Sequence, residues 1–596
     1  MGKDNSIGEM IHDARKQRNV RGKQLCRGLC SEAALSNYEN GERIPDSLLF
    51  YTLIGRLGKG IDRFCIMISD EDGEYYRWRK ETQDAVWKED WVKLEQLLKT
   101  YHDMYVVENR IQEQYSLYLS YVVLIRRYKK YDEAFRTIER ALRCTVPHPL
   151  QWDSATELLC ADEIHVFLLY LMALMQGNMI EGRDAYCLFQ KLEDYVVTWV
   201  DDTFEKSKII PRLVCIKIHL FGAKLSTEER ILCEKMALEI LKKSSEIYDM
   251  PEILRLLLLD LEEINSKEYS QYLKQREALV YYLKKYGYGD AFYPEKWYGV
   301  RYQYYLVKEY LLFGRERVGL TQEKLSEDIC AVETYSRIEN GKVHPSTKKF
   351  SQLLEKLNLR MGYYQSQIIT DNLEDLELMT RQRCAYCSEE FQEEQELLNE
   401  LRKRLDMNLT ENRQYIDFLQ AITDFDFERI DEEEQVRRFE EILKYSWETN
   451  KNFFTKTEKD IIYCIALFYR KRDSQKSLQL INEVLSSENR LEEPSWYANG
   501  ALKRLLAGLY ADREEFEKSN QLTEECIREM ISYQDGMMLS PCVNILGWNA
   551  ERCHSRDYEQ LYQDAIYLSD LFDNKMVHQK QLEYYEKHVQ SGMVWY

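Results

Sequence analysis

The sequence predicts an all-α protein built as a tandem duplication. Three observations support this prediction. The main helix breakers are scarce, with 24 Gly and 9 Pro in 596 residues, whereas β-sandwiches and barrels of this length need many turns. Apolar residues recur at helical spacing through residues 75–300 and 385–596. A segment near the N-terminus also recurs without a gap 300 positions later.

The repeated segment covers about 60 positions, and chance matching of helical sequence does not explain its identities. Weaker matches continue beyond it: Leu97-Leu98 pairs with Leu397-Leu398, and Glu108-Asn109-Arg110 pairs with Glu411-Asn412-Arg413. We infer two copies, each with a small module and a long helical tail, at residues 7–66, 75–300, 307–366 and 385–596. The residues that recur at an offset of 300 are Glu9, Arg15, Leu25, Cys30, Ser36, Glu39, Asn40, Gly41, Pro45, Phe50, Leu53 and Leu57.

The first small module, residues 7–66, is typical of four or five short helices. Ser31 is a candidate N-cap for a helix over 32–38, because its hydroxyl can accept from an unpaired backbone N–H. Gly41 and Gly341 suit a left-handed C-terminal cap, which glycine adopts without steric cost. Pro45 and Pro345 suit the start of the next helix. The apolar face that joins the second and third helices is Leu25, Leu29 and Leu35.

Both modules resemble the Cro-repressor (XRE) type of helix-turn-helix. The second copy carries Gly319-Leu-Thr-Gln-Glu-Lys-Leu325 and then Tyr335-Ser-Arg-Ile-Glu-Asn-Gly-Lys342, and the first keeps Leu35-Ser-Asn-Tyr-Glu-Asn-Gly-Glu42. The resemblance implies that an arginine of the first helix braces the module by pairing with the glutamate of the Glu-Asn-Gly motif. The matching pairs are Arg15 with Glu39 and Arg315 with Glu339.

The resemblance also implies that the third helix enters the DNA major groove and presents its N-terminal residues to base edges. Arg337 could bind a guanine or a phosphate, Gln322 matches a residue that contacts the DNA backbone, and Thr321 would cap the second helix. The first copy has Arg21-Gly22 at the latter positions, and Gly22 lacks the side chain for that contact. DNA binding is therefore better supported for the second module. The candidate contacts are Thr321, Gln322, Val332, Glu333, Thr334, Ser336, Arg337 and Lys342 in the second copy, and Arg21, Lys23, Ser31, Glu32, Ala33, Ala34, Ser36 and Asn37 in the first.

The charge distribution sets the modules apart from the rest of the chain. The whole chain carries 82 basic and 102 acidic residues, a net charge of −20. Residues 7–66 have ten basic and seven acidic residues (+3) and residues 307–366 have ten and eight (+2), which leaves −25 for the remainder. Any DNA contact must therefore be local. Glu32 and Glu333 oppose phosphate at reading positions, although a glutamate can accept from cytosine.

The two tails are similar to tetratricopeptide repeats. Small residues at the expected positions occur over 117–142, 461–485 and 505–526, which supports stacked helical hairpins of about 34 residues, with five or six per tail. The predicted fold class is therefore a helix-turn-helix module plus an α-solenoid, duplicated. This combination is similar to the peptide-responsive regulators of Gram-positive bacteria, which implies a signalling peptide or protein partner in the solenoid and action as a dimer.

Other kinds of chemistry lack their motifs. The sequence has no HExxH, no GxxxxGK[ST] and no GxSxG, and its nine histidines show no ligand spacing. A single Cys-x-x-Cys at Cys384 and Cys387 has no second ligand pair, so two thiols on a helix are the favoured interpretation. The strongly apolar stretch over 166–175 is shorter than the roughly 20 residues of a membrane span. We expect a cytoplasmic protein with reduced cysteines, no enzymatic activity, no cofactor, no metal and no membrane contact.

Two functions follow from these observations. The first is a transcriptional regulator that binds double-stranded DNA. In this function the duplication supplies both DNA-reading modules, so that one chain is a pseudo-dimer, or else two chains form a homodimer. The second is an interaction scaffold whose helix-turn-helix modules no longer bind DNA.

Overall fold

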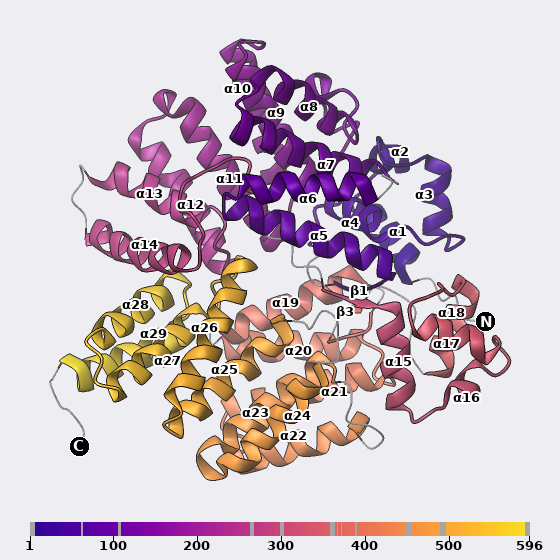
Figure 1. Cartoon of the computed structure of the whole chain (residues 1–596), viewed down its shortest axis with the longest axis vertical. Coiled ribbons are helices and arrows are strands. Elements are labelled where there is room, and N and C mark those ends of the chain that lie inside the picture. Colours follow the sequence, from indigo (N-terminus) through magenta and orange to yellow (C-terminus); the bar gives the residue numbers. More distant parts are fainter. Residues whose placement is uncertain are drawn as a thin grey trace.

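The computed structural model describes residues 6–60, 64–104, 109–262, 267–297, 303–357, 364–365, 367–370, 372–387, 390–447, 454–488 and 496–590. It confirms the predicted fold class: two helix-turn-helix modules and two helical solenoids. The first half of the chain forms the upper part of the molecule in Figure 1 and the second half forms the lower part. The expected residue limits of the four domains remain predictions.

The first half consists of one module and five helical hairpins among its described residues. The module contains α1 (Ser6–Gln17), α2 (Gly22–Cys26), α3 (Glu32–Glu39) and α4 (Ser47–Arg56). The hairpins pair α5 with α6, α7 with α8, α9 with α10, α11 with α12 and α13 with α14. Their bounds are α5 (Asp70–Trp87), α6 (Trp91–Met104), α7 (Arg110–Val123), α8 (Tyr131–Arg143), α9 (Ala161–Gln176), α10 (Gly182–Trp199), α11 (Thr203–Phe221), α12 (Thr227–Ser244), α13 (Met250–Leu261) and α14 (Lys267–Lys285).

The second half repeats this order and adds one helix at its end. Its module contains α15 (Val307–Arg317), α16 (Gln322–Ser326), α17 (Val332–Glu339) and α18 (Thr347–Lys356). Five hairpins follow, α19 to α28, and then α29. Their bounds are α19 (Leu373–Cys387), α20 (Phe391–Arg404), α21 (Thr410–Asp426), α22 (Glu432–Trp447), α23 (Lys456–Arg472), α24 (Ser474–Glu488), α25 (Trp496–Asp512), α26 (Phe516–Ser532), α27 (Leu539–Arg552), α28 (Tyr558–Leu571) and α29 (Lys575–Tyr584).

The three segments that resemble tetratricopeptide repeats each span a hairpin. Residues 461–485 lie on α23 and α24, and residues 505–526 lie on α25 and α26. Residues 117–142 are divided between α7 and α8 by a π-helical turn over Leu124–Tyr128 and by Lys129 at φ 57°. A left-handed residue therefore ends the helix at this point, although no glycine or proline in the sequence marks the end.

A small sheet, which the sequence analysis missed, joins the two halves. Strand β1 (Phe64–Ile68) lies between β2 (Gln303–Leu306), to which it is parallel, and β3 (Tyr364–Gln365), to which it is antiparallel. In the antiparallel pair Phe64 is opposite Gln365 and Cys65 is opposite Tyr364. At the repeat offset of 300, Tyr364 and Gln365 are the counterparts of Phe64 and Cys65. Each residue of the pair is therefore opposite the counterpart of its neighbour. This exchange is the pattern that a two-fold axis produces.

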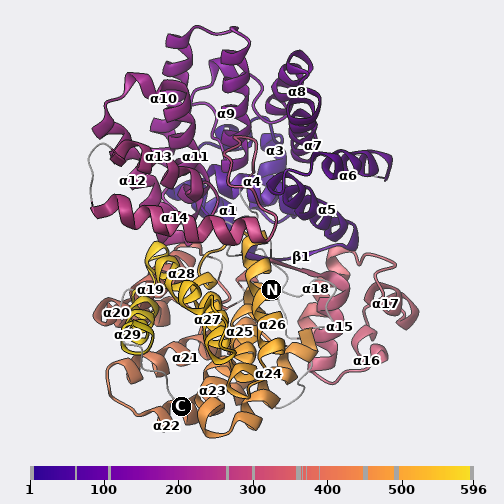
Figure 2. The same cartoon turned by 60° about the vertical axis from the view of Figure 1, so that its left-hand side comes forward.

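A second contact between equivalent residues lies at the opposite end of the solenoids. Glu246 and Asp535 form an antiparallel bridge, Ile247 N donates to Gln534 O over 3.0 Å, and Gly536 N donates to Ser245 O over 2.8 Å. These residues hold the same place in the turns before α13 and α27, at an offset of 289. Helix α14 also lies against its counterpart α28 in both views (Figure 1, Figure 2). The two halves are therefore related by a pseudo-two-fold axis.

The buried core divides unequally between the modules. One continuous apolar cluster runs through both solenoids and includes Ile11, Leu35 and Phe50 of the first module. The second module has its own smaller cluster, which contains Leu325, Tyr335 and Leu353. The first module is thus part of the solenoid core, whereas the second folds around a separate core.

Candidate nucleic-acid interface

The reading helices of the two modules are α3 and α17, and Figure 1 shows both on the right-hand side of the molecule, one in each half. Ser31 Oγ accepts from Ala34 N over 3.1 Å at the start of α3, and Thr321 Oγ1 accepts from Lys324 N over 3.3 Å at the start of α16. Gly41 and Gly341 follow α3 and α17 at φ 74° and 69°. The Ser31 cap marks the start of α3 and the two glycines mark the ends of both reading helices, whereas Ala331 precedes α17 without a side-chain cap.

The proline that follows each reading helix lies two residues before the first residue of the next helix. Asp46 caps α4 by accepting from Leu49 N over 2.9 Å, and Pro45 precedes that cap. Ser346 is the cap residue of α18, preceded by Pro345. The prolines therefore stiffen the approach to the cap rather than occupying the first turn.

An arginine–glutamate pair braces each module. Arg15 donates to both carboxylate oxygens of Glu39 over 2.6 Å and to Val20 O over 3.0 Å. Arg315 donates to Glu339 over 2.7 Å and to Leu320 O over 2.9 Å. Burial opposes ionisation of Glu39, but the hydrogen bonds from Arg15 and His12 outweigh it and lower the pKa of that carboxyl. The pair joins the first helix of each module to its reading helix.

The structure shows additional partners for the glutamate of the second module. Tyr335 is fully buried, and its hydroxyl donates to Glu339 over 3.1 Å. The side-chain amide of Gln322 also donates to Glu339. Gln322 thus contacts its own module in this structure, so a contact with the DNA backbone requires the amide to turn outward.

Most of the other candidate contacts face solvent. In the second module Thr321, Glu333, Arg337 and Lys342 are exposed, while Gln322, Val332, Thr334 and Ser336 are half-buried. In the first module Arg21, Lys23, Ser31, Glu32, Ala33 and Ser36 are exposed, while Ala34 and Asn37 are half-buried. Both reading helices therefore leave their N-terminal turns accessible.

The two reading surfaces differ in charge at two equivalent positions. Arg337 and Lys342 of the second module correspond to Asn37 and Glu42 of the first. With its amide nitrogen toward Glu42, Asn37 donates to that carboxylate over 3.1 Å. Within the described residues no carboxylate lies within ion-pair distance of Arg337 or Lys342. The second module thus presents free cations where the first presents a carboxylate and the amide bound to it.

A second difference, which the sequence analysis did not consider, concerns the start of the fourth helix. Lys348 and Lys349 lie in the first turn of α18, exposed and half-buried respectively. Their counterparts in the first module are Leu48 and Leu49, which are buried in the solenoid core. The alignment at an offset of 300 contained this signal, because both lysines replace leucines. They add positive charge to the second module alone.

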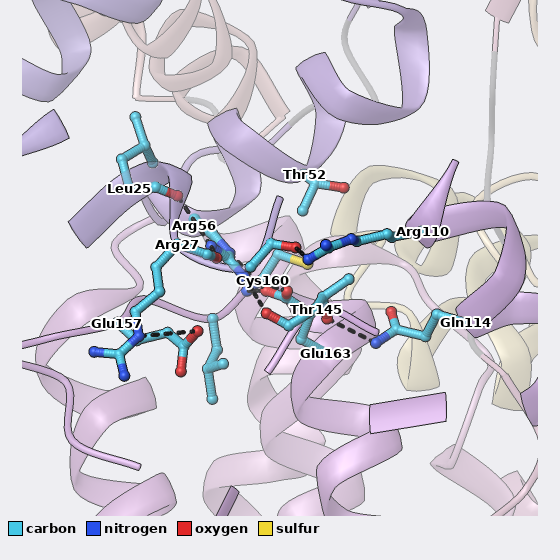
Figure 3. A network of polar contacts seen from close by, with 12 residues as sticks. Leu25, Arg27, Thr52, Arg56, Arg110, Gln114, Thr145, Glu157, Cys160 and Glu163 are labelled. Carbon is cyan, nitrogen blue, oxygen red and sulfur yellow. Dashed lines mark hydrogen bonds and ion pairs between the residues drawn. The ribbon is translucent and has the colours of Figure 1, made fainter. Parts of the chain in front are cut away.

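A buried arginine fastens the first module to its solenoid (Figure 3). Arg56, at the end of α4, is fully buried and donates to Glu163 over 2.9 and 2.5 Å. The same guanidinium donates to the carbonyls of Leu25, Arg27 and Thr145 over 3.0, 2.6 and 3.3 Å. Burial disfavours the charged guanidinium, but the charge of Glu163 outweighs it and raises the pKa of Arg56.

The second module docks through a different set of contacts among the described residues. Its Arg317 donates to Glu458 over 3.0 Å, and its Lys308 pairs with Asp70 of the first half over 2.5 Å. Glu163 and Glu458 are equivalent, because each accepts from the backbone N–H of the residue that caps its helix, Cys160 and Thr455. Each module therefore pairs an arginine with the equivalent glutamate of its own solenoid, but of the two arginines only Arg56 is fully buried.

Other kinds of site have no support in the described part of the chain. No group of three or more His, Cys, Asp or Glu side chains there is arranged to hold a metal ion. No helix described by the structure has the length and apolarity needed to cross a bilayer. Cys384 is exposed and lies on α19 with Cys387, whose side chain lies outside the described residues.

Comparisons with known proteins place the second module in a family. Residues 314–364 match the helix-turn-helix family. No curated protein sequence matches the chain. Among solved structures, PlcR of Bacillus thuringiensis in complex with the peptide PapR7 and DNA is 17% identical, with 46% of this chain and 98% of that chain covered and a TM-score of 0.33. The pheromone receptor Rgg2 of Streptococcus dysgalactiae is 15% identical, with 48% and 100% covered and a TM-score of 0.26. ComR of S. thermophilus, in complex with DNA and its signalling peptide ComS, is 17% identical, with 46% and 97% covered and a TM-score of 0.30.

Proposed function

We propose that the protein is a DNA-binding transcriptional regulator whose second helix-turn-helix module is the principal reader. The observation that carries this proposal is the set of unpaired cations on a module that matches the helix-turn-helix family. Arg337 and Lys342 are exposed on and after the reading helix, and Lys348 is exposed in the first turn of α18. Such cations neutralise phosphates, and an arginine exposed on a reading helix can bind a guanine. The proposed action takes place in the cytoplasm.

The chain acts in this proposal as its own dimer. Helix-turn-helix dimers bind two half-sites related by their two-fold axis. The exchange between β1 and β3 and the bridge between Glu246 and Asp535 give one chain the symmetry of such a dimer. Because Asn37 and Glu42 replace Arg337 and Lys342 in the first module, the two half-sites are not identical. The first module supplies the weaker contact.

The solenoids are the sensing part of the proposed regulator. Stacked hairpins offer a continuous inner face formed by the first helix of each hairpin, and such faces bind extended peptides and protein segments. A peptide or protein bound there could change how the two modules are held against each other.

Binding to genomic DNA fragments, selected in vitro and measured over a series of salt concentrations, tests the proposal. A regulator gives tight sites whose affinity falls steeply with salt. Arg337→Ala should weaken the best site by roughly 1–3 kcal/mol if the guanidinium binds a guanine. The matched control is Arg556→Ala, because Arg556 is exposed in the turn between α27 and α28, far along the chain from both modules. Absence of salt-dependent binding at low salt would favour the scaffold function.

A further inference from the structure

The segment that links the first solenoid to the second module lies on the inner face of that solenoid. Residues 288–297 follow α14 and form neither helix nor strand. Helices α5, α7 and α11 bind the main-chain carbonyls of this segment. Trp87 Nε1 donates to Trp297 O over 2.8 Å, Tyr118 OH to Glu295 O over 2.5 Å, and Arg212 Nη1 to Pro294 O over 2.7 Å. Each of these helices is the first of its hairpin, so the segment crosses the face that the hairpins share.

The side chains of the segment are bound as specifically as its main chain. Trp297 is 1% exposed, and its ring lies 4.5 Å from that of Tyr118 and 4.6 Å from that of His165. Glu295 pairs with Arg126, and Lys296 pairs with Glu89 over 3.2 Å. Glu295 and Lys296 are both nearly completely buried.

Closer to α14 the segment is held by ions and by a tyrosine. Asp290 pairs with Arg276 over 2.9 Å and with Lys284 over 2.9 Å. The hydroxyl of Tyr288 donates to Asp84 over 2.6 Å. Every charged residue of the segment therefore has a partner of opposite charge on the solenoid, as in a peptide-binding groove that is filled by its ligand.

The equivalent part of the second half takes a different path. After α28, the counterpart of α14, the chain continues as α29, which packs on α27 and α28: Gln581 accepts from Ser540 over 3.0 Å, and Tyr584 lies 5.8 Å from the Trp548 ring. The counterpart of Arg212 is Arg504 on α25. Its only hydrogen bond within the described residues is to Tyr463 OH, over 2.7 Å, and its Nε has no acceptor there.

We propose that residues 288–297 are a tethered peptide ligand of the first solenoid, so that the first inner face is permanently occupied and an external peptide is received by the second. This inference rests on the proposed sensing function. It names the solenoid that senses, and it assigns Arg504 as the group that would bind a carboxylate of that peptide. A short tether holds its ligand at an effective concentration of about a millimolar, so an external copy of the segment cannot compete at micromolar concentration.

A fluorescent synthetic peptide with the sequence of residues 286–297 tests the tethered ligand in the full-length chain. The unchanged chain should not bind it below about millimolar concentration. The test variant replaces Pro294, Glu295, Lys296 and Trp297 by Gly, Ser, Gly and Ala, and it should bind the peptide at least tenfold more tightly. Tyr118→Phe added to that variant should weaken the binding of the peptide several-fold. Equal binding by both chains, or none by the substituted chain, would overturn the proposal.

A second measurement does not depend on the fold of the substituted chain. Tyr118→Phe alone, in the otherwise unchanged protein, removes one hydroxyl and should increase hydrogen exchange in residues 288–297. Tyr170→Phe is the matched control, because Tyr170 is also buried on the first helix of a hairpin, α9, but its ring packs against Phe135. Equal exchange in the two variants would contradict the tether. Neither measurement involves DNA, so a failure here leaves the proposed DNA binding to be judged by its own experiment.

Discussion

Replacing Arg56 with methionine should detach the first module from its solenoid. The change removes five hydrogen bonds, and among the described residues it leaves Glu163, which is 1% exposed, with only the Cys160 N–H as a donor. Loss of one partner of a buried ion pair costs about 3–5 kcal/mol, because the remaining charge is uncompensated. Since about 1.4 kcal/mol is a factor of ten, local opening of α1 to α4 should become roughly 10²–10⁴ times more frequent.

Hydrogen exchange measured separately for the two modules detects this opening, because it reports local unfolding without assuming that the whole chain unfolds at once. Amides of α1 to α4 should exchange faster, and those of α15 to α18 should not change. The chain contains its own control in Lys356, the counterpart of Arg56. Lys356 binds the carbonyls of Lys324 and Glu327 but is exposed and has no buried carboxylate partner.

Lys356→Met should therefore cost about 1 kcal/mol or less. Glu163→Gln added to Arg56→Met should restore part of the lost protection, because a buried amide replaces a buried charge. The reasoning is refuted if Arg56→Met leaves exchange in α1 to α4 unchanged, or if Lys356→Met has an equal effect on α15 to α18.

Three further predictions concern backbone conformation, charge and pH. Gly28→Ala and Gly319→Ala both place a Cβ at positive φ (76° and 67°), but a Cβ on Gly28 would overlap the Thr145 carbonyl whereas Gly319 faces open space. Gly319→Ala should lower the free energy of unfolding by about 1–2 kcal/mol, and Gly28→Ala should lower it clearly more, as measured by denaturant unfolding. Asn37→Arg with Glu42→Lys should strengthen DNA binding and make the slope of log affinity against log salt steeper by about 2, and an unchanged slope would show that the first module does not contact phosphates. Burial, reinforced by the charge of Asp260, raises the pKa of the Glu234 carboxyl to about 8. The folded chain therefore holds a proton that the unfolded chain releases near its usual pKa of about 4.3, so the free energy of unfolding should fall as pH rises from about 4.5 to 8. Glu234→Gln should flatten this dependence on pH.

Local features of the modules could be predicted from sequence because they depend on residues near one another. The Ser31 cap, the left-handed Gly41 and the spacing of Arg15 and Glu39 all lie within one short motif. The duplication was visible for the same reason, since identical residues recur at a constant offset. Short-range chemistry and repetition therefore account for the predicted fold class.

Contacts between distant segments could not be predicted in this way. Arg56 and Glu163 are 107 positions apart, and nothing in either local sequence indicates the other. Strand β1 is a five-residue apolar run, which periodicity cannot distinguish from a short buried helix. Residues 288–297 have no periodicity at all, and only their buried contacts with α5, α7 and α11 identify them as a bound segment.

The central claim is that one chain carries both readers of an operator. The most direct test is the mass of the complex between the purified protein and its best selected DNA site, measured at a protein concentration just above saturation. We predict one chain per duplex, with protection of two half-sites and loss of the stronger one in Arg337→Ala. Two chains per duplex, or a single protected half-site that Arg337→Ala leaves intact, would contradict the account.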